Sequence, residues 1–572
     1  MRFVNQVAPG KAEEGPRTGR TWPFRQRRDT DRDRAWRESR GHGPVRHALA
    51  PALVALVPLG FLAVFFVWPV VAILRLGLAE GGVVDVLARA ETWQLVGFTV
   101  GQAAASTALA LVAGLPVAFL LARTSFRGLG LVRVVILVPF VLPTVVVGLA
   151  FRTLLPDGGV FTIVLANAFF NVAVVARTVA GLWSHLDRRA TDAARSLGAS
   201  PARAFTSVTL PALAPAVGSA AAVVFLFCAT SFGVVLILGG ARFRTLETEI
   251  YLRTVELLDL SGAAALSLLQ VVAVVAALTV GALARRRRET ALRLRGRASV
   301  ARRPSGGLEW TVTAVAAAVV ALLLLPVTVL VGRSFAGGLA GYRALTGTGY
   351  AGSLQVSGVE AALNSVRAAT DATVLAVTLG TLASVVLVSL SRGRVRRGVV
   401  ETMDTALMLP LGVSAVTVGF GYLVTLDLLP GDLRTSAALV PLAQALVVTP
   451  LVIRMLLPVL RSIDVRLRQA AASLGASPGR VWREVDVPLA GRSLLTAFAF
   501  GYVVALGEFG ATSFLARPDT ATLPVAIARL LSRPGELNNQ MAYAACTLLI
   551  VVTVAAVALV ESVPGRSGVG EF

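Results

Sequence analysis

Long apolar stretches separated by short polar segments are the dominant pattern of this chain. The first stretch runs from about Leu49 to Leu76. At roughly 20 residues per membrane crossing, the pattern predicts twelve spanning helices and an all-α polytopic membrane protein. The predicted spans are 49–76, 95–122, 131–155, 160–183, 212–240, 262–284, 309–333, 363–390, 400–426, 435–460, 491–515 and 541–561.

Composition supports a membrane protein and excludes several other classes. The 572 residues are 55% hydrophobic, with a mean hydropathy of +0.75. The net charge of +22 comes from short basic clusters between apolar stretches, which is typical of cytoplasmic loops rather than of nucleic-acid binding. Cys228 and Cys546 lie inside apolar runs, and the three histidines (His42, His47, His185) are scattered. We therefore expect neither a disulfide framework nor a metal site.

The basic clusters also predict the orientation. With twelve spans, all of them fall on one side of the membrane, as the positive-inside rule requires, whereas the loop 77–94 on the other side carries mixed charge. Both termini are therefore expected in the cytoplasm, and the protein in the bacterial cell (cytoplasmic) membrane. The clusters are Arg123, Arg127 and Arg133, the loop after span four, the stretch 285–303, Arg392 to Arg397, and the loop after span ten.

Charge and hydropathy divide the chain into four parts. Residues 1–47, with twelve Lys or Arg and six Asp or Glu, predict a disordered basic cytoplasmic tail. The apolar run that follows is too long for a signal-peptide core. A first six-span domain is expected over 48–284, a basic cytoplasmic linker over 285–308 and a second six-span domain over 309–562.

A sequence repeat relates the two predicted domains. The segment 187–203 recurs 277 positions later as 464–480, and the ungapped register continues through Phe232-Gly233 with Phe509-Gly510. Chance does not produce so many matches, so the halves are homologous. Both copies lie in the predicted cytoplasmic loop between the fourth and fifth spans of their half.

The repeated segment predicts a rigid elbow, that is, two short helices joined by a turn. Asp187 and Asp464 are candidate N-caps, and the glycines at 198 and 475 are candidate helix stops. Ser-Pro at 200–201 and 477–478 then restarts a helix. The paired alanines that precede each stop leave room for another protein. An alternative interpretation is an interfacial helix whose arginines contact lipid phosphates, but two equivalent copies disfavour it.

These segments carry a family resemblance. The first copy reads Asp192-Ala-Ala, then three residues, Gly198, nine residues and Val208-Thr-Leu-Pro211. This pattern resembles the cytoplasmic Glu-Ala-Ala signature of permeases in binding-protein-dependent importers. The second copy keeps the same spacing. The resemblance implies the type I ABC importer permease fold, with the elbows as coupling helices that dock on ATPase subunits. The residues to which it assigns that role are Asp192, Ala193, Ala194, Gly198, Ser200 and Pro201 in the first copy, and Gln469, Ala470, Ala471, Gly475, Ser477 and Pro478 in the second. Only the first copy keeps a carboxylate at its leading position, so unequal contacts are expected.

Beyond the signature, the segments 230–251 and 506–527 resemble the fused permeases of ferric-iron and thiamine importers. We expect ferric iron as the solute, with thiamine or another small solute as the alternative. The only lysine, Lys11, lies in the tail, so the chain has no P-loop and no catalytic residues of its own. No cofactor is expected in this chain, because ATP is bound by two copies of a separate ATPase subunit.

A substrate-binding protein is expected to deliver the solute from outside. The loops 241–261, 333–362 and 516–540 are its predicted docking face.

Glu508 is the most notable residue within the predicted spans. A carboxylate near a helix centre is costly and normally faces a cavity or a partner. With its first-half counterpart Ser231, it is a candidate for the translocation path, and pairing with a polar group is the alternative. A twelve-span secondary transporter explains the topology but leaves the paired elbows unexplained. A third alternative, an enzyme acting on lipids, is disfavoured because the sequence shows no recognisable nucleophile or metal cluster.

Overall fold

The computed structural model describes residues 44–79, 82–126, 128–240, 242–286, 303–304, 306–392, 397–425 and 436–561. Most of the predicted tail (1–47) and of the predicted linker (285–308) therefore lies outside the described residues. Within these ranges every regular element is a helix, which confirms the all-α class. The helices from Pro51 onward belong to one compact unit, Pro51–Phe572.

The helices of the first half run from α2 to α14. Their bounds are α2 (Pro44–Leu62), η1 (Ala63–Val67), α3 (Trp68–Leu78), α4 (Gly82–Ala88), α5 (Ala90–Arg123), α6 (Leu129–Val141), α7 (Thr144–Leu154), α8 (Val160–Trp183), α9 (Arg189–Ser196), α10 (Pro201–Ala204), η3 (Phe205–Thr209), α11 (Leu210–Ala229), α12 (Gly233–Leu238), α13 (Leu246–Val255) and α14 (Leu260–Arg286).

The second half repeats this order. Its helices are α15 (Gly307–Ser334), α16 (Ala340–Ala344), η5 (Tyr350–Gly352), α17 (Gly358–Arg392), α18 (Arg397–Met408), η6 (Leu409–Gly412), α19 (Ala415–Thr425), α20 (Leu439–Ser462), α21 (Val465–Ser473), α22 (Pro478–Val481), η9 (Trp482–Asp486), α23 (Val487–Gly507), α24 (Thr512–Leu515), α25 (Leu523–Ser532) and α26 (Glu536–Glu561).

Ten of the described helices are long and apolar enough to cross a membrane, and two further predicted spans are broken. The predicted span 131–155 is the pair α6 and α7, bent by 97°, and the predicted span 400–426 is the corresponding second-half pair, bent by 94°. Pro143 explains the first break, because proline forces the preceding residue out of the helical region, and Leu142 is extended at φ −67°, ψ 135°. In the second break Val413 is extended in the same way.

The fifth span of each half also differs from the prediction. Expected at 212–240 and 491–515, the spans are continuous 29-residue helices over Pro201–Ala229 and Gly479–Gly507. Each begins in the predicted elbow and passes through one π-helical turn, η3 or η9, without a break. We call them lever 1 (Pro201–Ala229) and lever 2 (Gly479–Gly507). At 1.5 Å per residue each is about 43 Å long.

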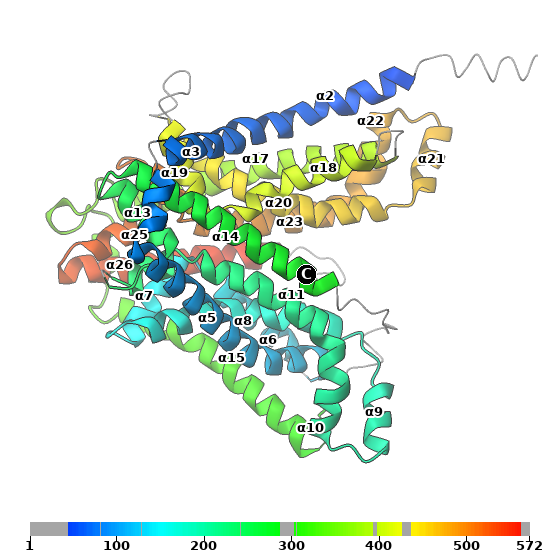
Figure 1. Cartoon of the computed structure of the whole chain (residues 1–572), viewed down its shortest axis with the longest axis horizontal. Helices are drawn as coiled ribbons and strands as arrows, with labels where there is room; N and C mark the ends of the chain where they lie inside the picture. The colour runs from blue at the N-terminus through cyan, green and yellow to red at the C-terminus, as the bar shows by residue number, and fades with distance from the viewer. Residues whose placement is uncertain are drawn as a thin grey trace, which may run out of the picture. The chain divides into compact units, whose positions relative to one another are not determined.

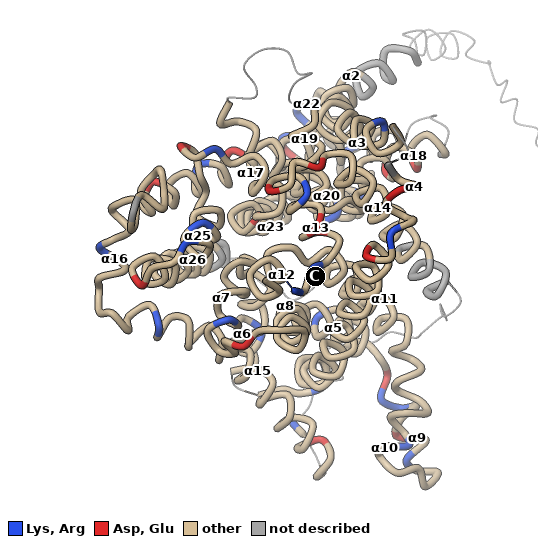
Figure 2. Tube along the Cα trace, turned by 60° about the vertical axis from the view of Figure 1, so that its left-hand side comes forward, with Lys and Arg blue, Asp and Glu red and all other residues tan. Residues whose placement is uncertain are grey.

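The packing repeats between the halves and also interlocks them. Lever 1 lies against α5 and α8, and lever 2 lies against α17 and α20. The first helix of each half, however, packs on the other half: α3 contacts α19, and α15 contacts α5 and α7. In Figure 1 the two elbows, α9–α10 and α21–α22, lie apart at the same end of the molecule. Figure 2 shows charged residues at the elbows and around α13, α16 and α25, with few in the bundle between them.

Candidate functional site

The first elbow ends α9 with a glycine in the left-handed region. Gly198 has φ +88°, a conformation that glycine adopts without a steric penalty. Its N–H donates to the carbonyl of Arg195 at 3.0 Å, and the N–H of Ala199 donates to the carbonyl of Ala194 at 3.1 Å. This pair of bonds is the Schellman motif, so the predicted stop is confirmed.

The second elbow has the same geometry. Gly475 has φ +83°. The N–H of Gly475 donates to Ala472 at 3.0 Å, and that of Ala476 donates to Ala471 at 3.1 Å. Identical stops at equivalent positions confirm that the repeat extends to the backbone.

The predicted helix restarts are also present. Ser200 Oγ accepts from the N–H of Arg203 at 3.3 Å, and Ser477 Oγ accepts from that of Arg480 at 3.4 Å. The leading caps differ between the halves. Asp464 is the N-cap of α21, as predicted. Asp187 lies one position before the N-cap of α9, although its carboxylate still accepts from the N–H of Arg189 at 3.0 Å.

Each elbow presents an exposed leucine at its turn, which we did not predict. Leu197 is 88% exposed and Leu474 is 89% exposed. Beside them the leading residues Asp192 and Gln469 are exposed, and of each alanine pair the first is exposed and the second half-buried. The signal was present in the sequence, because Leu-Gly stands at the same register in both copies. Each elbow tip is thus an apolar side chain surrounded by small residues.

The two elbows are fastened to their levers by different contacts at equivalent positions. In the second half Arg468 of α21 binds Asp486 of η9, with Nη2 and Nε at 2.5 and 2.6 Å from Oδ1. In the first half the corresponding residues are Thr191 and Thr209, whose hydroxyls lie 3.3 Å apart. The halves therefore differ in their polar fastening, an ion pair against a neutral hydrogen bond. Unequal elbows were predicted, but from Asp192 and Gln469.

Ser231 and Glu508 occupy equivalent positions just beyond the lever ends. Ser231 is 7% exposed and donates to Asn167 Oδ1 at 2.8 Å. Glu508 is 8% exposed and accepts from the N–H groups of Ala511 and Thr512 at 2.8 and 3.0 Å, and from the Thr512 hydroxyl. Glu508 was expected near a helix centre, but it lies at the C-cap of α23. Its role in the path stays a prediction.

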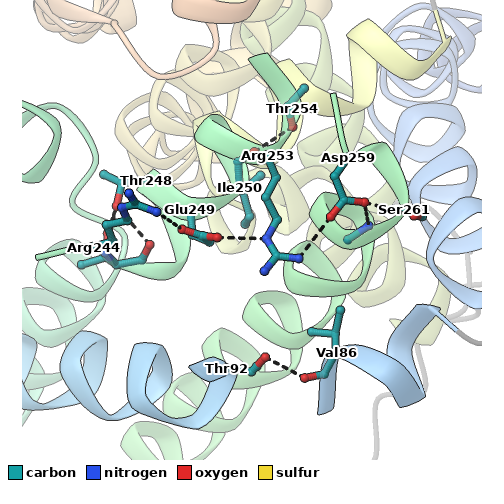
Figure 3. A network of polar contacts seen from close by, with 12 residues as sticks. Val86, Thr92, Arg244, Thr248, Glu249, Ile250, Arg253, Thr254, Asp259 and Ser261 are labelled. Atoms are coloured by element: carbon teal, nitrogen blue, oxygen red, sulfur yellow. Dashed lines mark hydrogen bonds and ion pairs between the residues drawn. The ribbon is translucent and has the colours of Figure 1, made fainter. Parts of the chain in front are cut away.

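At the end of the molecule opposite the elbows (Figure 1), an ion-pair network fixes α13 (Figure 3). Glu249 binds Arg244 at 3.3 Å and Arg253 at 2.9 Å, and Arg253 also binds Asp259 at 3.2 Å. Asp259 in turn accepts from the N–H of Gly262 at 2.9 Å, in the first turn of α14. The network gives residues 244–262, most of the predicted outer loop 241–261, a defined conformation.

No metal centre is evident in the described part of the chain. No group of three or more His, Cys, Asp or Glu side chains is close enough there to hold an ion. Cys228 and Cys546 are both buried and free.

Comparison with known proteins agrees with a permease fold. Residues 110–289 match the family model described as "Binding-protein-dependent transport system inner membrane component". The molybdenum transport system permease protein ModB of Mycobacterium tuberculosis is 36% identical over 201 residues, which cover 32% of this chain and 75% of that protein. The chain belongs to this family of inner-membrane transport components.

Two further relatives are similar over nearly the whole chain. The thiamine transport system permease protein ThiP of Brucella abortus (strain 2308) is 25% identical over 519 residues, covering 85% of this chain and 91% of the relative. ThiP of Escherichia coli (strain K12) is 25% identical over 504 residues, covering 83% and 90%. The similarity thus includes both halves of the repeat.

Proposed function

We propose that this chain is the pore subunit of an ATP-driven importer and that its solute is thiamine. It lies in the bacterial cytoplasmic membrane with both termini in the cytoplasm. The observation that carries the transport function is the pair of matching elbows, each continuous with a spanning helix. Thiamine is favoured over the ferric iron expected from short segments, because the two relatives described above that cover both halves are thiamine transport permeases.

The ATPase subunits are proposed to bind one at each elbow, so that one permease takes two copies. The exposed Leu197 and Leu474 are the contact points, because removing a fully exposed leucine side chain from water is favourable by about 1.5 to 3 kcal/mol. The small residues around each leucine allow the partner's surface to approach. Since each elbow runs without interruption into a lever, closure of the ATPase pair displaces both levers. A substrate-binding protein delivers the solute on the opposite face.

The test is co-purification of the permease with its ATPase subunit. We expect the double variant Leu197→Asp/Leu474→Asp to insert normally and to lose the ATPase. The matched control is Leu257→Asp, because Leu257 is 62% exposed but lies in the outer loop. Retention of two ATPase copies by the elbow variant would overturn the docking assignment.

A second experiment addresses the solute. Proteoliposomes that contain the permease, its ATPase and its binding protein are supplied with labelled thiamine, ferric iron or molybdate. We expect thiamine uptake that requires ATP on the side of the membrane to which the elbows project. Uptake driven by an ion gradient without ATP would favour a secondary transporter, and ATP-dependent uptake of ferric iron alone would restore the first expectation.

A further inference from the structure

Two phenylalanines at equivalent positions of the repeat meet face to face between the halves. Phe232 and Phe509 are 277 positions apart in the sequence, the offset that relates the elbows. Their rings stack at 5.3 Å between centroids and 18° between planes. They are 5% and 4% exposed. Equivalent residues of a two-fold repeat touch one another only near its axis, so this stack marks the centre of the seam between the halves.

The stack lies directly beyond the ends of both levers. Lever 1 ends at Ala229 and lever 2 at Gly507, so each phenylalanine follows within three residues. A displacement of the elbows is therefore carried along two continuous helices of about 43 Å to the two rings. In Figure 1 the elbows are separated at one end of the molecule, while the rings are in contact at the other end of the levers.

Additional aromatic rings extend the stack on one side only. Tyr251 of α13 packs on Phe232 at 5.2 Å and on Phe514 of α24 at 5.3 Å. The residues equivalent to Tyr251 and Phe514 are Ala528 and Ile237, which carry no ring. The seam therefore has a wall of aromatic rings contributed by both halves.

A fully buried carboxylate lies one helical turn from this wall. Glu247 precedes Tyr251 by four positions on α13, which places the two side chains on the same face, and it is 0% exposed. It accepts a hydrogen bond from Ser414 of the second half at 2.9 Å and another from Gln270 of α14. None of the ion pairs among the described residues includes Glu247. Within the described part of the chain, an acid that forms no ion pair thus bridges the seam.

We propose that the Phe232–Phe509 stack seals the translocation path and that Glu247 selects positively charged organic solutes when the rings part. Ring faces attract cations. Glu247 supplies the opposite charge when the rings part and water reaches it, because burial in the closed seam disfavours the charged form of the acid. The position equivalent to Glu247 in the second half is Pro524, so the repeat carries an acid at this position in the first half alone. The inference deepens the proposed function, because thiamine is an organic cation. It disfavours an anion such as molybdate.

The seal is tested by passive leak from proteoliposomes without ATP or binding protein. We expect Phe232→Ala/Phe509→Ala to release trapped tetramethylammonium and the wild type to retain it. The control is Phe151→Ala, because Phe151 packs on Phe169 within the first half, is 2% exposed and lies on neither lever. Vesicles of the double variant that stay as tight as wild type, with ATP-driven import intact, would overturn the seal.

A cross-link keeps the test decisive if the alanine variant does not fold. In a background with Cys228→Ala and Cys546→Ala, Phe232→Cys and Phe509→Cys are joined by a short bis-methanethiosulfonate reagent, whose two disulfide links can be reduced. We expect the joined protein to lose import and to regain it on reduction. Undiminished import by the joined protein would refute a path through the seam.

Charge selection is tested in the leaking double variant. Adding Glu247→Gln should reduce the ratio of tetramethylammonium leak to molybdate leak about tenfold, since contacts to a charged group exceed neutral ones by about that factor. The control is Glu249→Gln, on the same helix but paired with two arginines. An unchanged ratio would show that Glu247 is only structural. If the ratio falls but intact protein imports no thiamine, the inference stands and the proposed solute fails.

Discussion

Replacement of Asp486 by alanine should uncouple the second elbow from its lever. Asp486 and Arg468 form the ion pair between α21 and η9, and their side chains are 8% and 14% exposed. The variant leaves the guanidinium of Arg468 largely buried without its carboxylate, because among the described residues its remaining hydrogen bond is to the carbonyl of Leu460 at 3.4 Å. The first elbow, which uses two threonines, would be unaffected.

The size of the effect follows from burial. Removing one partner of a buried ion pair destabilises a protein by about 3 to 5 kcal/mol. Because these two side chains keep some exposure, we expect Asp486→Ala to cost about 3 kcal/mol of stability. Replacing both residues by threonine, as in the first elbow, should cost within about 1 kcal/mol, because no unpaired charge remains. A two-state pore needs about 5.5 kcal/mol to move from 1:99 to 99:1. A loss of about 3 kcal/mol at one elbow is therefore a large share of the free energy needed to switch the pore.

The assay is ATP-driven uptake in proteoliposomes, with thermal unfolding of the purified protein measured in parallel. We expect Asp486→Ala to lower uptake at least about tenfold while the ATPase stays bound, and Arg468→Thr/Asp486→Thr to restore most of it. The control is Asp404→Ala, whose partner Arg461 lies at 3.7 Å in a pair that is 35% and 46% exposed. Wild-type uptake by Asp486→Ala, or a double variant no better than the single one, would refute the reasoning.

Two further variants test the turn of the first elbow and the role of Glu508. Gly198→Pro should abolish import while membrane insertion stays intact, because proline requires φ near −65° and Gly198 has +88°; normal import together with normal ATPase association would contradict the coupling role. Glu508→Gln should import at close to the wild-type rate and lose about 1 kcal/mol of stability, as expected for a weakened cap. A strong loss of import at native thermal stability would instead place Glu508 in the path.

The elbows were predictable because their signals are local. A helix stop followed by a Ser-Pro restart is encoded within a few residues, and the repeat showed the pattern twice. The ends of the fifth spans were not predictable, because the apolar segment Gly233–Leu238 follows closely and extends a hydropathy window, although the helix stops at Ala229. For the same reason Glu508 was assigned to a helix centre.

Tertiary contacts account for what else was missed. The bend at Pro143 was not predicted, since proline is tolerated in spanning helices when neighbours satisfy the backbone. The register of Phe232 and Phe509 was visible in the sequence, but nothing local indicates that the two rings stack. The same holds for Glu247, whose importance comes from Ser414, 167 positions away.

The exchange of first helices between the halves has a consequence for synthesis. Pro69 and Ile73 of α3 pack closely on Gly421 of α19, so a surface made early waits for a segment 348 positions beyond Ile73. At 5–20 residues per second a ribosome needs roughly 20 to 70 s to make that segment. During this interval the nascent first half exposes the face of α3 to lipid or to the insertion machinery. A gene cut between the halves would therefore yield two fragments that mature only when made in the same cell.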